Sequence, residues 1–287
     1  MKLSPLGQNI GAEVEDIDLN DVTDETFPGI RDALWEYRVL RFRGQNLEDE
    51  AHLGLNTRFG PLDYTPGRLI RGEDRIPESL HMEIVSNIVI EGNKSFGSLS
   101  NDELIWHSDM SFLKRPYGVS ILRAVELPPA GGETSFSNMV RALEELPDDL
   151  RGQIDGRSTS QDGFLDSKDG AMVGEVTAEA DRVENQYNGA PGIHPIVRTH
   201  SETGRQFLYL GRRPRSSVVD LPAAESEALL DALWAHATQP RFIWTQEWQL
   251  GDLILWDNRC TLHQRTAFDP ASRRILRRTA CLGEVPY

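Results

Sequence analysis

His107 and Asp109 stand two residues apart, flanked by the bulky side chains of Trp106 and Phe112. On an extended segment such a pair points to the same side, so both side chains can reach one metal ion. His263, just downstream of a second strand-like segment, is the third candidate ligand. Two histidines and one carboxylate leave three metal positions open, an arrangement used by non-heme Fe(II) oxygenases. A His-X-Asp tripeptide is a weak signal by itself, and the combination with His263 is what predicts an iron site.

Arg274 and Arg278 form the second pair that could do chemistry, because on a strand they share one face with Leu276. A guanidinium turned into a pocket is costly unless an anion meets it, and its planar fork suits a carboxylate. The spacing alone slightly favours another interpretation, in which both arginines are solvated charges that balance an acidic chain. Both hypotheses stay open at this point.

The rest of the chain must position these residues, and most of it is patterned as short strands with a few helices. Strands are predicted over residues 39–43, 83–90, 118–127, 134–138, 196–200, 205–210, 242–248, 253–256 and 275–282. Helices are predicted over 24–37, 47–59, 140–146 and 223–237. Many short strands with helices around them predict a mainly β fold with flanking helices, built on a jelly-roll core (a double-stranded β-helix).

One domain over residues 1–287 is expected, since no repeat or low-complexity linker divides the chain. Residues 63–80 lack a clear period and contain several proline and glycine breaks, which predicts an active-site lid. Residues 151–192 are polar and weakly patterned, and they predict a variable insertion with short helices.

Composition narrows the class of protein. Hydrophobic residues at 39% and charged residues at 26% are ordinary for a globular chain. The net charge of −15 argues against a nucleic-acid partner, which would require a basic face. No apolar stretch is long enough for a membrane span or a signal peptide. Two cysteines, Cys260 and Cys281, are too few for a disulfide framework and favour the cytoplasm; Cys260 is expected to be a buried thiol.

Four motifs together resemble one enzyme family. They are WHSD at residues 106–109, GGET at 131–134, WDNR at 256–259 followed by His263, and RILRR at 274–278. In this order and spacing they resemble the taurine dioxygenase and 2,4-dichlorophenoxyacetate dioxygenase family, and the likeness covers nearly the whole chain. Residues 197–200, 210–211 and 236–239 look closer to the dichlorophenoxyacetate branch.

The resemblance implies a role for each motif residue. His107, Asp109 and His263 would bind Fe(II). Thr134 and Arg274 would hold the distal carboxylate of 2-oxoglutarate, which is a co-substrate together with O2. The family fold is a double-stranded β-helix, in agreement with the strand pattern, and a homo-oligomer is expected.

The resemblance also implies the reaction, which is hydroxylation of a small carboxylate or sulfonate with formation of succinate and CO2. Arg278 would face the anionic group of this substrate, and Met110 and Glu103 are expected to line its pocket. An aryloxyalkanoate is one candidate, and its hydroxylated product would cleave at the ether bond. The taurine branch carries a histidine in the lid region, whereas YTPG at residues 64–67 has none, which weakens taurine as the substrate.

Two other classes of protein fit part of the pattern. A zinc hydrolase could use two histidines and an aspartate around a bound water, but its chemistry has no need for Thr134 with Arg274. A non-catalytic anion-binding protein would keep the arginines without any need for His107 and Asp109.

Overall fold

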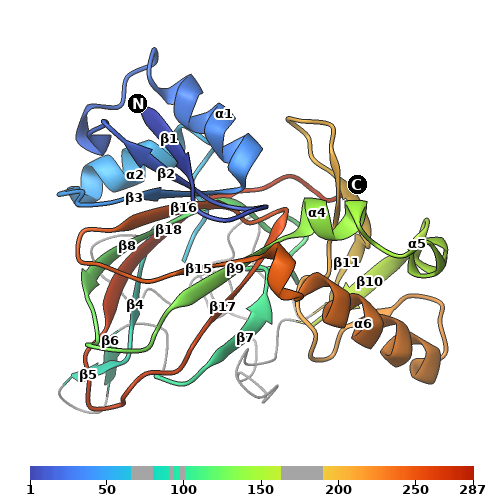
Figure 1. Ribbon diagram of the computed structural model, residues 1–287. Helices are drawn as coiled ribbons and strands as arrows, with labels where there is room; N and C mark the ends of the chain where they lie inside the picture. The colour runs from blue at the N-terminus through green and yellow to red at the C-terminus, as the bar shows by residue number, and fades with distance from the viewer. Residues whose placement is uncertain (66–79, 91–93, 97–100, 163–189) are drawn as a thin grey trace.

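The computed structural model describes residues 1–65, 80–90, 94–96, 101–162 and 190–287 (Figure 1). The helices are α1 (Phe27–Tyr37), α2 (Asp49–Thr57), α4 (Met139–Glu144), α5 (Asp148–Ile154) and α6 (Ala223–Ala237), with 3-10 turns at Leu19–Asp21 and Pro240–Phe242. The strands are β1 (Lys2–Pro5), β2 (Ala12–Glu15), β3 (Val39–Phe42), β4 (Met82–Ser86), β5 (Ile88–Ile90), β6 (Lys94–Phe96), β7 (Leu104–His107), β8 (Tyr117–Glu126), β9 (Thr134–Asn138), β10 (Ser158–Gln161), β11 (Gly192–Pro195), β12 (Val197–Thr199), β13 (Gln206–Leu208), β14 (Ser217–Val218), β15 (Ile243–Gln246), β16 (Leu253–Asp257), β17 (Thr261–Arg265) and β18 (Ile275–Leu282). No helix in the described ranges has the length and apolar character needed to cross a bilayer.

The larger layer is a seven-stranded sheet in the order β1-β2-β3-β16-β8-β18-β4. Its strand pairs are antiparallel except for β2 and β3. Side chains alternate along β16, as strand geometry requires. Leu253 and Leu255 pack in one buried cluster with residues of α1 and α2, whereas Ile254 and Trp256 belong to a different cluster. The N-terminal helices therefore cover one face of this sheet (Figure 1).

The second layer is a four-stranded antiparallel sheet in the order β15-β9-β17-β7. Phe136 of β9 is fully buried in the cluster that contains Trp256, and the two ring centroids lie 5.7 Å apart. His263 of β17 packs against both rings, at 6.0 Å from Phe136 and 5.3 Å from Trp256. One candidate ligand is thus held by the apolar core that the two sheets share.

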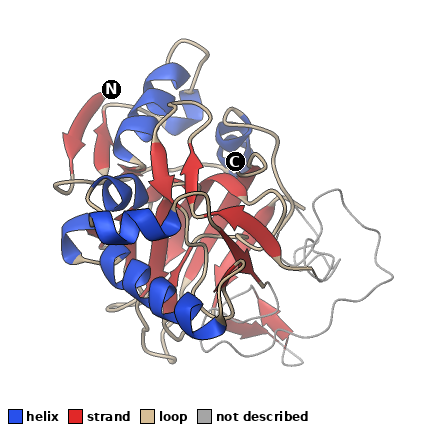
Figure 2. Ribbon diagram, turned by 90° about the vertical axis from the view of Figure 1, so that its right-hand side faces the viewer, coloured by secondary structure: helices blue, strands red, loops and turns tan. Residues whose placement is uncertain are grey.

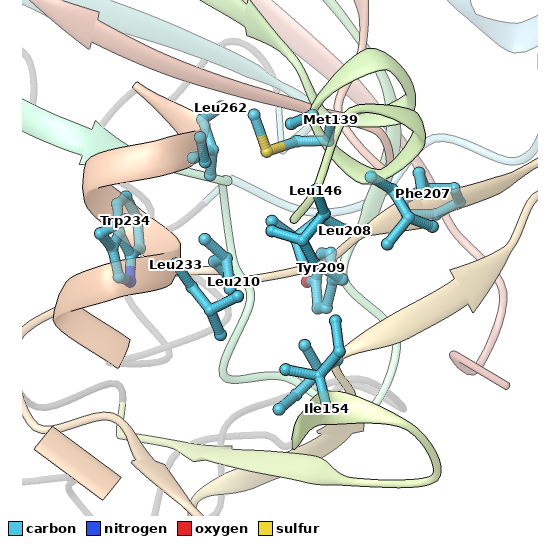
Figure 3. Packing of buried hydrophobic residues seen from close by; sticks show 14 of the residues in the cluster. Met139, Leu146, Ile154, Phe207, Leu208, Tyr209, Leu210, Leu233, Trp234 and Leu262 are labelled. Atoms are coloured by element: carbon cyan, nitrogen blue, oxygen red, sulfur yellow. The ribbon is translucent and has the colours of Figure 1, made fainter. Parts of the chain in front are cut away.

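The remaining helices pack on the other face of β17. Leu262, next to His263 in the strand, lies in a buried cluster with residues of α4, α6 and β13. Figure 3 shows Leu262 together with Met139 of α4, Leu233 of α6 and Leu208 of β13. Figure 2 shows several helices gathered along one side of the strands. Because Leu262 must face this helical side, His263 is turned toward the facing sheet.

Most predicted elements are present in the structure. The mainly β character with flanking helices is confirmed, and the predicted segments 134–138, 223–237 and 275–282 coincide with β9, α6 and β18. The strands predicted over 196–200 and 205–210 correspond to β12 and β13, which pair antiparallel. The strand pairings establish two antiparallel layers, and the jelly-roll core stays a prediction.

The structure differs from the predicted elements in three places. The strand predicted over 83–90 is divided at Asn87, whose side chain donates to the carbonyl of Ser272 and accepts from the N–H of Arg274. The short strands β1 and β2 were not predicted, and neither was β17. His263 was expected after a strand, but it lies inside the five-residue strand β17.

The two weakly patterned regions are only partly described. Of the lid predicted over 63–80, residues 66–79 lie outside the described ranges, and of the insertion predicted over 151–192, residues 163–189 do so. Within the second region, β10 pairs with β11 and with β14, so its described ends belong to a small sheet.

Candidate active site

The side chains of His107, Asp109 and His263 converge, although two strands and a turn supply them. His107 is the last residue of β7, and its Cα partner in the adjacent strand β17 is His263. His107 Nε2 lies 3.6 Å from Asp109 Oδ1, and His263 Nε2 lies 3.7 Å from Asp109 Oδ2. All three potential ligand atoms lie within 4.8 Å of one another, and all three residues are buried.

The reason for this convergence differs from the predicted one. Asp109 does not continue the strand of His107 but lies in the turn after it, and Met110 adopts a positive φ of 53°. Asn258 holds this turn from a distant part of the chain. Its Oδ1 accepts from the Asp109 N–H at 2.9 Å, and its Nδ2 donates to the Asp109 carbonyl at 3.0 Å. The turn and its amide clamp, and not strand alternation, aim the Asp109 carboxylate.

The protonation states suit a metal ion. The Nδ1–H of His107 donates to the carbonyl of Ile105 at 2.7 Å, and its Nε2 faces Asp109. Burial, followed by the neighbouring His107, lowers the pKa of His263 to about 3, so that this imidazole is neutral. Burial alone would raise the pKa of Asp109, but Arg278 and the two histidines hold it well below its usual range.

His107, the neutral imidazole of His263 and the ionised carboxylate of Asp109 therefore present three donor atoms close to a common point. This donor set fits a divalent first-row metal with open coordination positions, such as Fe(II).

Arg278 links the triad to the large sheet. Its Nη1 donates to Asp109 Oδ2 at 2.6 Å, while its Nε donates to Glu83 Oε2 at 2.8 Å and its Nη2 lies 2.5 Å from the same oxygen. Glu83 and Arg278 are Cα partners across β4 and β18. Burial opposes the charge of Arg278, but Asp109 and Glu83 raise its pKa above the ordinary value and keep it cationic. The hypothesis of a solvated surface charge does not hold for this residue.

Arg274 is a buried cation of a different kind. It is 2% exposed, and its Nη2 donates to the carbonyl of Gly132 at 3.2 Å. Within the described residues, no carboxylate oxygen lies within ion-pair distance of its guanidinium. Burial first and Arg265 second lower its pKa to about 9, against the opposite effect of Glu133. An organic carboxylate would supply the missing countercharge.

Gly132 and Thr134 complete the surroundings of Arg274. Gly132 has a φ of +76°, and a Cβ there would lie 3.0 Å from Arg274 Nε, so the close approach requires glycine. Trp248 Nε1 donates to Thr134 Oγ1 at 3.0 Å. The Thr134 hydroxyl thus accepts from the indole and keeps its own hydrogen for another acceptor.

The two remaining predicted residues lie in different surroundings. Met110 is 6% exposed and packs with Phe112, Tyr117 and Ala280 beside the triad. Glu103 is exposed, and no described contact connects it with the triad. The structure brings Met110 to the site, whereas a substrate-binding role for Glu103 stays a prediction.

A second group, His200, Asp257 and Cys260, also has its polar atoms close together. The polar atoms of His200 and Asp257 are already hydrogen-bonded to other groups of the protein. His200 Nε2 bonds Asp257 Oδ2 at 2.7 Å, its Nδ1 accepts two backbone N–H groups, and Arg259 donates to both oxygens of Asp257. Burial raises the pKa of the Cys260 thiol. This cluster is structural, and the predicted buried thiol is confirmed.

Sequence reasoning missed three residues that build the site. Asn258 lies in the WDNR motif at residues 256–259, which was noted for its family resemblance. The motif pointed to this residue, but it did not indicate that the side chain holds the Asp109 turn. Trp248 ends a predicted strand, and Glu83 begins one. For these two residues no local pattern could have shown the contact.

Comparison with known proteins agrees with this geometry. The family described as "Taurine catabolism dioxygenase TauD, TfdA family" matches residues 2–280. An alpha-ketoglutarate-dependent 2,4-dichlorophenoxyacetate dioxygenase of Cupriavidus pinatubonensis is 36% identical, over 98% of this chain and 97% of its own length. Pentalenolactone F synthase of Streptomyces arenae is 34% identical, over 100% and 97%. The crystal structure of a taurine dioxygenase from Burkholderia xenovorans superposes with a TM-score of 0.77 at 31% identity, over 99% and 92%.

Proposed function

This chain belongs to the TauD, TfdA family of dioxygenases, on its 2,4-dichlorophenoxyacetate side, and we propose that it hydroxylates a small organic carboxylate of the aryloxyalkanoate kind. It is an Fe(II)- and 2-oxoglutarate-dependent enzyme that uses O2. Family membership decides against the zinc hydrolase and against the non-catalytic binding protein. The proposed substrate class agrees with the similarity to an alpha-ketoglutarate-dependent 2,4-dichlorophenoxyacetate dioxygenase.

His107, Asp109 and His263 are the proposed iron ligands. Bound iron and 2-oxoglutarate together supply the oxidation of a substrate C–H bond, with release of succinate and CO2. The chain's part is to hold the ligands. The carbonyl of Ile105 keeps His107 in the tautomer that offers Nε2, and Asn258 holds the Asp109 turn. Ligand orientation of this kind typically accounts for a 10–100-fold effect on metal affinity or activity.

Arg274 and Thr134 are the proposed partners of the distal carboxylate of 2-oxoglutarate. The supporting observation is a buried guanidinium without a carboxylate partner among the described residues, close to a GGET turn whose threonine can still donate. A bound carboxylate would satisfy both groups at once.

Arg278 carries the proposal for the primary substrate. A guanidinium has five N–H bonds. In Arg278, one N–H of each nitrogen faces Glu83 or Asp109, so three of the five are used. Among the described residues the other N–H groups have no acceptor, so they can face the anionic group of a substrate next to the metal. Tyr117, which lies 6.0 Å from the Arg278 guanidinium, and Met110 in the same cluster supply apolar surface for the remainder of that substrate.

Further parts of the proposal concern the whole chain. A jelly-roll core in a single domain is supported by the facing antiparallel sheets and by the likeness to a solved taurine dioxygenase. Two buried free cysteines support a reducing compartment such as the cytoplasm. A lid over 63–80, which the weak pattern of these residues predicts, and a homo-oligomer stay predictions.

The test is succinate formation by purified protein with Fe(II), ascorbate and 2-oxoglutarate under air. A panel of aryloxyalkanoates, other small carboxylates and sulfonates should contain compounds that accelerate it. His107→Ala is the inactive control, and succinate no faster than this control across the panel would contradict the proposal. Arg274→Ala should raise the KM for 2-oxoglutarate, whereas Arg278→Ala should mainly raise the KM for the primary substrate. The reverse pattern would exchange their roles.

A further inference from the structure

Glu83 places a carboxylate against the arginine that is proposed to meet the primary substrate. It belongs to β4, the last strand of the large sheet, and its Cα partner in β18 is Arg278. Val85 lies two residues further along β4, on the same face, and packs in the buried cluster that contains Leu276. Glu83 therefore occupies the core-facing row of an edge strand, where its side chain is only 10% exposed.

The described contacts of Glu83 use one of its two carboxylate oxygens. Oε2 accepts from Arg278 Nε at 2.8 Å and lies 2.5 Å from Nη2. Nη1 of the same guanidinium donates to Asp109 Oδ2 at 2.6 Å. One cation thus meets two carboxylates, and Glu83 is the one that does not belong to the candidate metal ligands.

This arrangement sets the charge that a substrate meets at Arg278. The charge of Asp109 serves the proposed metal ion, so Glu83 offsets the charge of the guanidinium. A carboxylate that approaches the remaining N–H groups of Arg278 is attracted by the guanidinium and repelled by Glu83 beside it. Both effects are large where little water is present, and they oppose each other. The hydrogen bonds from Arg278 remain, and a neutral carbonyl oxygen can accept them as a carboxylate does.

We propose that Glu83 is a specificity-determining residue, which makes Arg278 recognise the hydrogen-bonding capacity of the substrate group more than its negative charge. The proposal rests on the function inferred above and deepens it. Besides carboxylates, the site accepts uncharged groups that carry a carbonyl oxygen, such as amides and esters.

A purely orienting role is the competing explanation. If Glu83 only fixed the direction of the Arg278 guanidinium, its loss would let the arginine move and would weaken the binding of every substrate. The two explanations predict opposite changes for a carboxylate. Removal of the Glu83 charge strengthens carboxylate binding in the first case and weakens it in the second.

The experiment measures binding without turnover. Protein loaded with Mn(II) and 2-oxoglutarate, in the absence of O2, is titrated by calorimetry with phenoxyacetate and with phenoxyacetamide, its uncharged analogue. Glu83→Gln keeps the length of the side chain and an acceptor for Arg278 but removes the charge. Its Kd for phenoxyacetate should fall by about tenfold relative to the wild type, a typical size for removal of one nearby like charge. The Kd for phenoxyacetamide should stay unchanged.

Two variants serve as controls. Glu83→Asp keeps the negative charge and should retain the preference of the wild type. Glu126→Gln removes a carboxylate that also pairs with an arginine, Arg273, but the side chain of Glu126 is 39% exposed, so neither Kd should change.

The wild-type protein carries a second measurement, which decides the question if the glutamine variant does not fold. With Glu83 present, the Kd values for phenoxyacetate and phenoxyacetamide should differ by less than about threefold. An arginine without an offsetting carboxylate would favour the acid by about tenfold or more.

The outcomes are distinct. An unchanged or higher Kd for phenoxyacetate in Glu83→Gln, an equal gain for both ligands, or no phenoxyacetate binding to either protein would overturn the role of Glu83. If the wild-type protein forms succinate with members of the substrate panel, such a result removes this inference alone. Absence of succinate across the panel would remove the proposed function together with it.

Discussion

Asn258→Ala tests whether the turn that carries Asp109 is held by one amide side chain. Asn258 is fully buried. Its Oδ1 accepts from the Asp109 N–H at 2.9 Å, and its Nδ2 donates to the carbonyls of Asp109 and Tyr117 at 3.0 and 3.1 Å. Alanine removes all three bonds and leaves three backbone groups of the turn and of β8 without their partner.

The expected effect has two parts. Each lost buried hydrogen bond costs about 1–1.5 kcal/mol, so the metal-free protein should lose about 3–5 kcal/mol of unfolding free energy. The Asp109 carboxylate should also lose its fixed direction, and the Kd for Mn(II) should then rise by about 10–100-fold, as for other residues that orient metal ligands. Urea unfolding of metal-free protein measures the first part, and calorimetric titration with Mn(II) measures the second.

Asn138→Ala provides the comparison. Asn138 also makes three hydrogen bonds to the backbone, as N-cap of α4 and as a donor to the carbonyl of Asn9, but none of them reaches the triad. This variant should lose stability and keep the wild-type Kd for Mn(II). If Asn258→Ala loses the same stability and also binds Mn(II) like the wild type, the amide is only a structural tie and the reasoning is refuted.

Three further predictions concern single residues. Trp248→Phe removes the donor to Thr134 Oγ1, so the Kd for 2-oxoglutarate should rise by about 3–10-fold while Mn(II) binding stays unchanged in calorimetry. Glu83→Leu leaves Arg278 as a half-buried, undercompensated cation and should cost about 3–5 kcal/mol in urea unfolding; the double variant with Arg278→Leu should recover part of this loss. Burial, with Arg123 second, lowers the pKa of fully buried His52 to about 3. Because an unfolded histidine titrates near pH 6.5, the unfolded state takes up the proton first, and His52 should withdraw about 3 kcal/mol of stability as the pH falls from 6.5 to 4, a dependence that His52→Leu should lack.

The sequence alone predicted the elements whose residues follow a local pattern. The helix at 223–237 and the strands at 134–138 and 275–282 have clear periods, and tertiary packing preserved them. The candidate iron ligands could also be identified from the sequence. The combination of His107 and Asp109 with His263 and the arginine pair indicated a metal site, although the His-X-Asp spacing alone was a weak signal. The hypothesis that Arg274 and Arg278 are turned into a pocket required the family resemblance, since the spacing slightly favoured solvated surface charges.

Other features depend on contacts between distant segments. The turn at Asp109 replaced the predicted extended segment because Asn258, from the other end of the chain, satisfies its backbone groups. Asn87 divided a predicted strand because its side chain binds the segment before β18. Neither event leaves a local signal, because in each case the partner lies far away in the sequence.

The sequence itself therefore determined which chemical groups form the candidate metal site, namely the side chains of His107, Asp109 and His263. Their meeting point was decided by tertiary structure, through the pairing of β7 with β17 that places His107 opposite His263. Strand register decided the partners of the arginines in the same way, with Glu83 opposite Arg278 and Thr134 opposite Arg265. The physical reason is that the register of distant strands is set by the apolar core that both sheets bury, and a shift of one residue would turn each of these side chains to the opposite face.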